Sequence, residues 1–373
     1  MPRRDRVTLP APGRGARGRY LLGPAVAACL AIQPPAAGAA APQTAPRDAL
    51  EVARLLAERY PQAASVSYIP ALSWSGALRL AELTGEVAWR ERAREGMQPL
   101  LEGDAPEVGA AYSLTRLGGY AAAADLGRLA GDGFAMARAR AAAELIVPDG
   151  GGPTVRFATG WTDDMFMATS LLARVGAAGD ERFLGAIGPL LVSYARRLQR
   201  PDGLFVHATD APHAWGRGNG FAALGLAEAL THLPEDWPEH SDLLDIFRGQ
   251  MRAFLGHQSE DGSWRQVIDQ PSSYQELSVT AMAVAAMARG VRLRWLDAET
   301  FLPVLERGWA AVAARVGEDG SVRDVCTSTA AGPTLQYYLE RPTVNGLDDR
   351  GGGLVLVAAL EMVELGRWRL GGR

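Results

Sequence analysis

Four of the five Asp-Gly dipeptides in the chain recur at nearly constant spacing, and this regularity limits the possible folds more than any other feature of the sequence. They are separated by 53, 59 and 58 residues: Asp149-Gly150, Asp202-Gly203, Asp261-Gly262 and Asp319-Gly320. An Asp-Gly pair marks a tight turn, and a fixed period of this size indicates a repeated structural unit. Six units of about 55 residues account for nearly all of the chain after residue 39.

Apolar residues at helical spacing predict two helices in each repeat. The predicted pairs are Ser73–Leu83 with Val87–Leu101, Gly109–Leu126 with Phe134–Ile146, Asp163–Val175 with Glu181–Leu198, Asn219–Leu230 with Leu243–Leu255, and Gln275–Arg289 with Thr300–Val316. Helix Pro46–Tyr60 has no partner upstream, and helix Gly352–Leu365 has none downstream. Pairing these two ends gives a sixth hairpin. We therefore predict an all-α fold, an (α/α)6 barrel of six helical hairpins, with an open α-solenoid as the alternative.

The first 39 residues differ from the rest of the chain. Six arginines precede the apolar run Tyr20–Ile32, which Ala37-Gly38-Ala39 follows as a small-residue cleavage pattern. We expect residues 1–39 to be a secretory signal peptide and residues 40–373 to form a single catalytic domain. An exported, periplasmic protein follows, although Cys29 lies in a lipoprotein-like box, so secreted and lipid-anchored forms stay open. No other segment has transmembrane length, so we expect no membrane span.

Charge and composition exclude several classes of function. The sequence contains no lysine, which rules out a Schiff base or a phosphate-loop lysine. Without residues 1–39 the chain has 32 Arg (38 − 6) and 41 acids (42 − 1), a net charge of −9, which argues against nucleic acid as a partner. One cysteine, Cys326, remains, so no internal disulfide is expected. No zinc, calcium or nucleotide motif is present, so we expect no metal and no cofactor; the oligomeric state is left open.

Two adjacent acids, Asp163 and Asp164, lie between Trp161 and a run of large apolar residues. With Thr162 as the N-cap, both acids fall in the first turn of a helix. Acids there stabilise the helix dipole, which is one explanation for their presence. The other explanation is catalytic, because an acid held against apolar side chains loses water, its pKa rises, and it becomes suited to donate a proton.

The predicted loops gather aromatic and hydrogen-bonding side chains of the kind that saccharide sites use. These candidates are His207, Trp161, Trp215, Trp264, Arg217 and Arg265. Arg217 lies among three glycines and can bind a carboxylate in bidentate fashion, or it can form an ordinary loop salt bridge. Individual tryptophans can equally be core residues at hairpin ends. Glu276 begins a helix, so capping of the helix dipole is an alternative to ligand binding.

Taken together, several segments resemble the unsaturated uronyl hydrolases of glycoside hydrolase families 88 and 105, especially the unsaturated rhamnogalacturonyl hydrolases. The resemblance covers most of residues 40–373 and is tightest between Trp161 and Arg341. The segments that carry it are 161–167 (WTDDMFM), 198–207 (LQRPDGLFVH), 215–220 (WGRGNG), 264–269 (WRQVID), 276–278 (ELS) and 324–326 (DVC).

The resemblance implies an (α/α)6 barrel, with Asp163 as the general acid/base and Asp164 as a less critical neighbour. It places His207, Trp215 and Arg217 at substrate-binding positions. A second carboxylate of the family falls near residues 104–109, where Asp104 and Glu107 are both candidates. Two positions depart from the family pattern: Phe221 stands where relatives usually have Trp, and Arg350 where they often have His. The full set of predicted substrate-binding residues is His207, Trp215, Arg217, Trp161, Phe221, Trp264, Arg265, Glu276, Asp104 and Glu107.

The resemblance also implies the reaction and its partner, an acidic oligosaccharide. The enzyme removes a 4,5-unsaturated uronic acid from the non-reducing end of lyase-generated oligosaccharides by acid-catalysed hydration of the C4=C5 double bond. Two alternatives are an inverting glycosidase on saturated glycans, which would need two carboxylates about 6.5–9.5 Å apart, and a non-catalytic carbohydrate-binding toroid. The leaving sugar and its linkage are not determined by the sequence.

Overall fold

The computed structural model describes residues 46–104, 108–109, 113–148 and 154–371. The described residues belong to the compact unit Ala45–Arg373. The predicted signal peptide, residues 1–39, and the candidate Glu107 lie outside the described residues. Within the described part of the chain, no helix is long and apolar enough to cross a bilayer.

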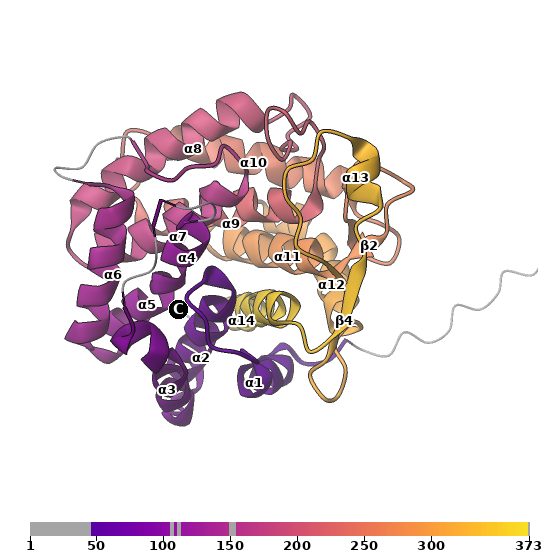
Figure 1. The fold of residues 1–373 in the computed structure, drawn as a ribbon. Helices are drawn as coiled ribbons and strands as arrows, with labels where there is room; N and C mark the ends of the chain where they lie inside the picture. The colour runs from indigo at the N-terminus through magenta and orange to yellow at the C-terminus, as the bar shows by residue number, and fades with distance from the viewer. Residues whose placement is uncertain (1–45, 105–107, 110–112, 149–153, 372–373) are drawn as a thin grey trace, which may run out of the picture. The chain divides into compact units, whose positions relative to one another are not determined.

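Six inner helices form a closed ring, each packed against the next and the last packed against the first. They are α2 (Tyr68–Thr84), α5 (Ala121–Ala130), α7 (Asp163–Ala177), α9 (Gly216–His232), α11 (Leu277–Arg292) and α14 (Asp349–Arg369). The contact between α14 and α2 closes the ring (Figure 1). This contact confirms the predicted (α/α)6 barrel and excludes the open solenoid, in which the two ends would not meet.

Each inner helix is paired with an outer helix in the sequence. The outer helices are α1 (Ala49–Arg59), α3 (Ala88–Glu102), α6 (Gly133–Ile146), α8 (Leu184–Leu198), α10 (His240–His257) and α12 (Ala298–Ala313). Helix α1 packs on α14, so the first and last helices form the sixth hairpin, as predicted. The short helices α4 (Ser113–Leu117) and η1 (Gly118–Tyr120) precede α5, and η2 (Glu181–Phe183) precedes α8.

Several predicted helix boundaries differ from the observed ones at the N-terminus. Helix α2 begins at Tyr68 rather than at Ser73, with Pro70 in its first turn. Proline is tolerated there because the first N–H groups of a helix have no intrahelical partner. The predicted start of α11 at Gln275 was wrong, because Gln275–Glu276 forms strand β2, paired antiparallel with β1 (Trp264–Arg265).

A second two-stranded sheet lies between α12 and α14. Strand β3 (Val322–Cys326) pairs antiparallel with β4 (Thr343–Gly346), and the short helix α13 (Leu335–Leu339) lies between them in the sequence. The pairing is irregular at Asp324, which adopts a positive φ of 62°. The segment between the two strands places α13 at the end of the barrel where α7 and α9 begin, as the contact of Tyr338 with His207 shows.

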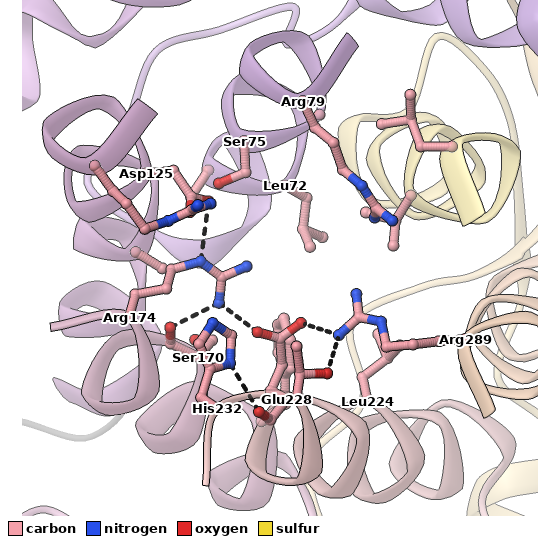
Figure 2. A pocket seen from close by; sticks show the side chains of 18 of the residues that line it. Leu72, Ser75, Arg79, Asp125, Ser170, Arg174, Leu224, Glu228, His232 and Arg289 are labelled. Carbon is pink, nitrogen blue, oxygen red and sulfur yellow. Dashed lines mark hydrogen bonds and ion pairs between the residues drawn. The ribbon is translucent and has the colours of Figure 1, made fainter. Parts of the chain in front are cut away.

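Deep in the barrel, each inner helix contributes one charged residue to a chain of ion pairs that we call the ion-pair ring. Going around the barrel from α5, the charges alternate in sign: Asp125, Arg174, Glu228, Arg289, Glu361 and Arg79. Arg174 lies 2.9 Å from Asp125 and 2.7 Å from Glu228 (Figure 2). Only α2 and α5, the two ends of the chain of pairs, are not joined directly by a pair among the described residues.

Glu361 joins the last inner helix to both of its neighbours. It is fully buried and lies 2.6 Å from Arg289, 2.9 Å from Arg79 and 3.3 Å from Arg292. Burial alone would raise the pKa of this carboxyl, but Arg289 and Arg79 outweigh it and lower the pKa to about 2. Because the folded pKa lies below the unfolded one, this stabilisation is present above about pH 4.5 and is lost as the pH falls toward 2.

We expect Glu361→Gln to lower the free energy of unfolding by about 3–5 kcal/mol at pH 7, because it leaves buried guanidinium groups without their counter-charge. Glu364→Gln is the matched control: Glu364 pairs with Arg79 and Arg292 but its side chain is 20% exposed. The control should cost about 1 kcal/mol or less. Chemical denaturation of both variants provides the measurement, and equal losses would contradict the special role of Glu361.

Candidate active site

Asp163 begins α7 at the end of the barrel where the inner helices have their N-termini. Its side chain is 23% exposed, and its Oδ2 lies 3.2 Å from Nε2 of His207. Among the described residues, no hydrogen bond reaches the second carboxyl oxygen, Oδ1. Asp163 therefore has one oxygen positioned by the protein and one that a bound molecule can reach.

The imidazole of His207 is buried beneath two tryptophans. Its ring centroid lies 4.4 Å from that of Trp215 and 5.4 Å from that of Trp161. The backbone fixes the residue as well, because the His207 carbonyl accepts a hydrogen bond from the N–H of Thr162. Three residues predicted from sequence (Asp163, His207 and Trp215) are thus brought together, and Trp161 completes the wall.

A tyrosine from α13 holds the other side of the His207 ring. The hydroxyl of Tyr338 lies 2.7 Å from Nδ1 of His207 and accepts a hydrogen bond of 3.0 Å from the N–H of Gly332. Burial raises the pKa of Tyr338 to about 12, so its hydroxyl carries a proton at neutral pH. That proton points to Nδ1 because Gly332 already supplies a donor to the oxygen. The hydrogen bonds therefore assign the proton of neutral His207 to Nε2, which donates to Asp163.

We expect Tyr338→Phe to change the tautomer of His207, because Nδ1 loses the hydroxyl that occupies its lone pair. Two-bond ¹H–¹⁵N correlation spectra of the labelled protein measure which ring nitrogen carries the proton. The wild type should show an Nε2–H imidazole and the variant a mixture. Tyr337→Phe, on the adjacent residue of the same helix, is the control. An unchanged His207 spectrum in Tyr338→Phe would contradict the assignment.

Asp164, the second of the adjacent acids, has a different environment. It is 2% exposed and accepts hydrogen bonds from the hydroxyl of Tyr194 at 2.5 Å and from the N–H groups of Thr159 and Gly160 at 2.7 and 2.9 Å. Burial is the largest cause of its pKa shift and raises the pKa to about 6 against these hydrogen bonds. The desolvated acid anticipated from sequence is therefore Asp164, and it anchors the loop before α7.

Thr162 occupies the predicted N-cap position of α7, but the prediction that its side chain caps the helix was wrong. Thr162 is the residue before the first turn of α7, but its side chain makes no capping hydrogen bond, and its buried Oγ1 has no partner among the described residues. A Cβ built on Gly218 would lie 2.6 Å from this Oγ1, so α9 packs tightly against it.

The raised pKa of Asp164 predicts a pH dependence of stability. Because the folded pKa is about 6 and the unfolded value 3.8, this contribution is complete below pH 4 and declines as the pH rises through 6. The wild type should therefore lose up to about 3 kcal/mol relative to Asp164→Asn between pH 4 and pH 7. Paired denaturation curves at several pH values measure this difference. A difference that grows in favour of the wild type with rising pH would contradict it.

Arg217 is buried behind Trp215, whose ring centroid lies 5.1 Å from its guanidinium carbon. Its Nη1 donates to the carbonyl of Cys326 at 2.6 Å, and its Nη2 donates to the carbonyl of Thr327 at 2.7 Å. Each terminal nitrogen therefore already donates one N–H to a backbone carbonyl. The guanidinium therefore has fewer free donors for a bidentate grip on a carboxylate than the sequence alone suggested.

Three predicted binding residues form part of the protein core instead. Trp264 is fully buried and donates its indole N–H to the carbonyl of Phe254. Phe221 is 1% exposed and stacks on Phe166 with centroids 6.0 Å apart. Glu276 is fully buried, and it has the capping role that the sequence left open as an alternative to ligand binding.

Glu276 caps α11, accepting hydrogen bonds from the N–H groups of Ser278 and Val279. It also accepts one from the N–H of Cys326, so it joins β3 to the barrel. Arg265 is half-buried and donates to the carbonyl of Ser273 within its own loop. Asp104 is exposed after the end of α3, and the structure shows no contact between it and Asp163.

Two tyrosines at the site were given no role from the sequence, although Tyr338 belongs to a segment, 337–341, that the sequence marks as a less specific candidate cluster. Tyr338 belongs to a five-residue helix that has no sequence signature of its own. Tyr68 begins α2 and is 9% exposed. Burial raises its pKa to about 12; the charges of Arg217 and Arg350 oppose this shift, and the charge of Asp163 adds to it. A longer prediction for α2 would have placed Tyr68 at the same end of the barrel as Asp163.

Comparison with known proteins identifies the family of this chain. The family model described as Glycosyl Hydrolase Family 88 matches residues 50–365.

The chain belongs to glycosyl hydrolase family 88.

Curated relatives of this family 88 chain carry related names. It is 27% identical over 232 residues to the unsaturated rhamnogalacturonyl hydrolase YesR of Bacillus subtilis strain 168. The matched region covers 60% of this chain and 62% of that protein. It is also 27% identical over 219 residues to an unsaturated 3S-rhamnoglycuronyl hydrolase of Alteromonas sp. strain LOR, covering 54% and 51%. The matched region thus spans about half to three fifths of the length of these relatives.

Solved structures support the fold of the family 88 chain. A possible member of the GH105 family from Salmonella enterica serovar Paratyphi A aligns with a TM-score of 0.75 and 16% identity, covering 86% of this chain and 94% of that one. An unsaturated glucuronyl hydrolase from Bacillus sp. GL1 aligns with a TM-score of 0.62 and 17% identity, covering 84% and 95%. At these identities the likeness concerns the fold.

Proposed function

We propose that the protein is an unsaturated uronyl hydrolase that removes a 4,5-unsaturated uronic acid from the non-reducing end of lyase-generated acidic oligosaccharides. Rhamnogalacturonan-type and related acidic glycans are the substrate class. Family membership supports the reaction type, and the names of the two relatives support the substrate class. The single observation that carries the proposal is the geometry of Asp163, reachable on one oxygen and held by His207 on the other.

The proposed reaction is a hydration in which one carboxyl serves twice. Asp163, protonated on Oδ1, gives its proton to C4 of the enol ether, and the developing cation is centred on C5. Water attacks C5, and the Asp163 carboxylate takes the proton that the water loses, so the acid is regenerated. The resulting hemiketal opens by breaking the C5–O bond of the ring, which leaves a C5 ketone and a hemiacetal at C1. The hemiacetal collapses to an aldehyde and its hydroxyl proton passes to the leaving oxygen, releasing a 5-keto-4-deoxyuronate and the shortened saccharide.

His207 holds Asp163 throughout this cycle. Its Nε2–H stabilises the carboxylate that forms after the first proton transfer, and Tyr338 keeps the imidazole in that tautomer. Trp161, which is partly exposed, provides an apolar surface on which the C–H face of a sugar can pack, and Trp215, which is 2% exposed, supports the His207 ring from the core side. A general acid/base positioned in this way commonly contributes about 10²–10⁴-fold to a rate.

The described carboxylates favour this mechanism over ordinary inverting hydrolysis. Glu276 and Asp164, the two buried acids nearest in sequence to the site segments, are both occupied by hydrogen bonds from backbone and side chains. Neither is free to activate a water opposite Asp163, as an inverting glycosidase requires. Asp163, with one oxygen accessible among the described residues, suits the hydration of a double bond; the candidate Glu107 lies outside the described residues.

We also propose that the protein is exported, on the basis of the signal-like composition of residues 1–39. Oligosaccharides released by polysaccharide lyases would then meet the enzyme outside the cytoplasm.

We expect Asp163→Asn to reduce turnover of unsaturated oligosaccharides by at least about 10³-fold, because Asn can neither donate nor recover the proton. Loss of the ultraviolet absorbance of the C4=C5 double bond in lyase digests of several acidic polysaccharides measures the rate. Asp245→Asn, on the exposed face of outer helix α10, is the matched control and should keep full activity. Unchanged turnover in Asp163→Asn would refute the role of Asp163.

The same assay separates the alternatives. Release of reducing sugar from saturated glycans without lyase treatment would identify an inverting glycosidase. Binding of unsaturated oligosaccharides by the wild type with no loss of absorbance would identify a non-catalytic carbohydrate-binding protein.

A further inference from the structure

The inner helices enclose a cavity of about 500 Å³ that the proposed reaction does not use. All six inner helices line it, so it lies inside the ring, and we call it the axial cavity. On α7 its lining residues are Phe166, Ser170, Arg174 and Ala177, which run along one face of the helix away from Asp163. Arg174 lies 11 residues beyond Asp163, or about 16 Å along the helix.

A layer of aromatic rings separates the axial cavity from the candidate active site. Tyr68 and Phe166 line the cavity, and both rings pack against Phe221, at 5.6 and 6.0 Å between centroids. Neither Asp163 nor His207 lines the cavity. The cavity is therefore a compartment of its own, with the ion-pair ring in its wall.

The carboxylates in this wall and the Glu361 carboxylate behind it are engaged by arginines of the barrel. Both oxygens of Glu228 are paired, one with Arg174 and one with Arg289, at 2.7 Å each. Both oxygens of Glu361 are paired as well. Arg128 and Arg174 likewise take the two oxygens of Asp125. Each oxygen of these three carboxylates thus already faces an arginine.

The arginines, in contrast, retain unused N–H groups. Nη2 of Arg174 makes no hydrogen bond with the described residues, and Figure 2 shows it turned into the open middle of the cavity. Nε of Arg292 is buried and also has no partner among the described residues. The free Nη2 of Arg174 is the donor that a ligand in the cavity can reach, and an acceptor-rich ligand would satisfy it.

The charge of the wall agrees with this chemistry. Five arginines belong to it (Arg79, Arg128, Arg174, Arg289 and Arg292) and four carboxylates oppose them (Asp125, Glu228, Glu361 and Glu364), giving 5 − 4 = +1. Glu82 also borders the cavity but pairs with Arg90 on outer helix α3. A single positive charge matches a monoanion better than a dianion such as sulfate.

We propose that the axial cavity binds a small organic monocarboxylate about the size of a hexuronic acid. The carboxylate would accept from Nη2 of Arg174, and the carbon skeleton would lie against Leu72 and Leu224, which also line the cavity. A volume of about 500 Å³ falls within the usual range for small-molecule sites, about 300–1,000 Å³. The inference does not depend on the proposed hydrolase activity.

Isothermal titration of the full chain with sodium D-glucuronate tests the proposal, with methyl glucoside and sodium sulfate as comparison ligands. Glucuronate should bind, and the neutral sugar and sulfate should bind at least about tenfold more weakly. The absence of glucuronate binding, or equal binding of the neutral sugar or of sulfate, would overturn the proposed ligand class.

Two variants assign the binding to the cavity. Ser75→Phe fills the cavity without removing an ion pair, and should abolish glucuronate binding while turnover of unsaturated substrate is retained. Ser241→Phe, an exposed position on α10, is the matched control and should bind as the wild type does. Arg128→Gln, at a side chain 46% exposed, removes the net charge and should weaken binding about tenfold.

Binding that survives in Ser75→Phe, or that is unchanged in Arg128→Gln, would place the ligand elsewhere and overturn the assignment. Because binding is measured without turnover, this outcome is distinguishable from a failure of the hydrolase proposal, which the absorbance assay reports separately.

Discussion

The ion pairs of the buried Glu361 carboxylate are the interaction on which closure of the barrel depends. It lies on the last inner helix and binds arginines of the first inner helix, α2, and of its other neighbour, α11. A buried charge of this kind is tolerated only when its partners are placed accurately, because each unpaired ion would have to be desolvated without compensation. The ion-pair ring therefore favours one arrangement of the six inner helices. The positions of the helix N-termini, and with them the candidate active site, follow from that arrangement.

The two halves of the barrel interior have opposite chemistry. At the N-terminal ends of the inner helices, one partly exposed acid, Asp163, lies against His207 and among aromatic rings. Beyond the aromatic layer, charged groups of both signs line a cavity. Adjacent residues on one helix turn illustrate how position decides role: Asp163 faces the site, whereas Asp164 is buried against Tyr194 and fixes the loop before α7.

The fold could be predicted from the sequence more completely than the candidate site. The helix pairs and the closure of the ring followed from turn spacing and apolar periodicity, and both were confirmed. The grouping of Asp163, His207 and Trp215 was anticipated, and the structure brings these residues together. The capping role of Glu276 was recognised only as an alternative, since a buried acid at a helix start looks the same in sequence whether it binds a ligand or a backbone N–H. The role of Tyr338 could not be assigned from the sequence, because its contact with His207 spans 131 residues.

The sequence by itself determined the number of helical hairpins, the family resemblance and the segments that surround the site, because these depend on local spacing and composition. Only the tertiary structure decided which of two neighbouring acids is accessible, which tryptophans belong to the core and how the charges of six helices pair. The physical reason is that burial and pairing are set by helices far apart in the chain. Solvent exposure of Asp163, desolvation of Asp164 and neutralisation of Glu361 each depend on such contacts.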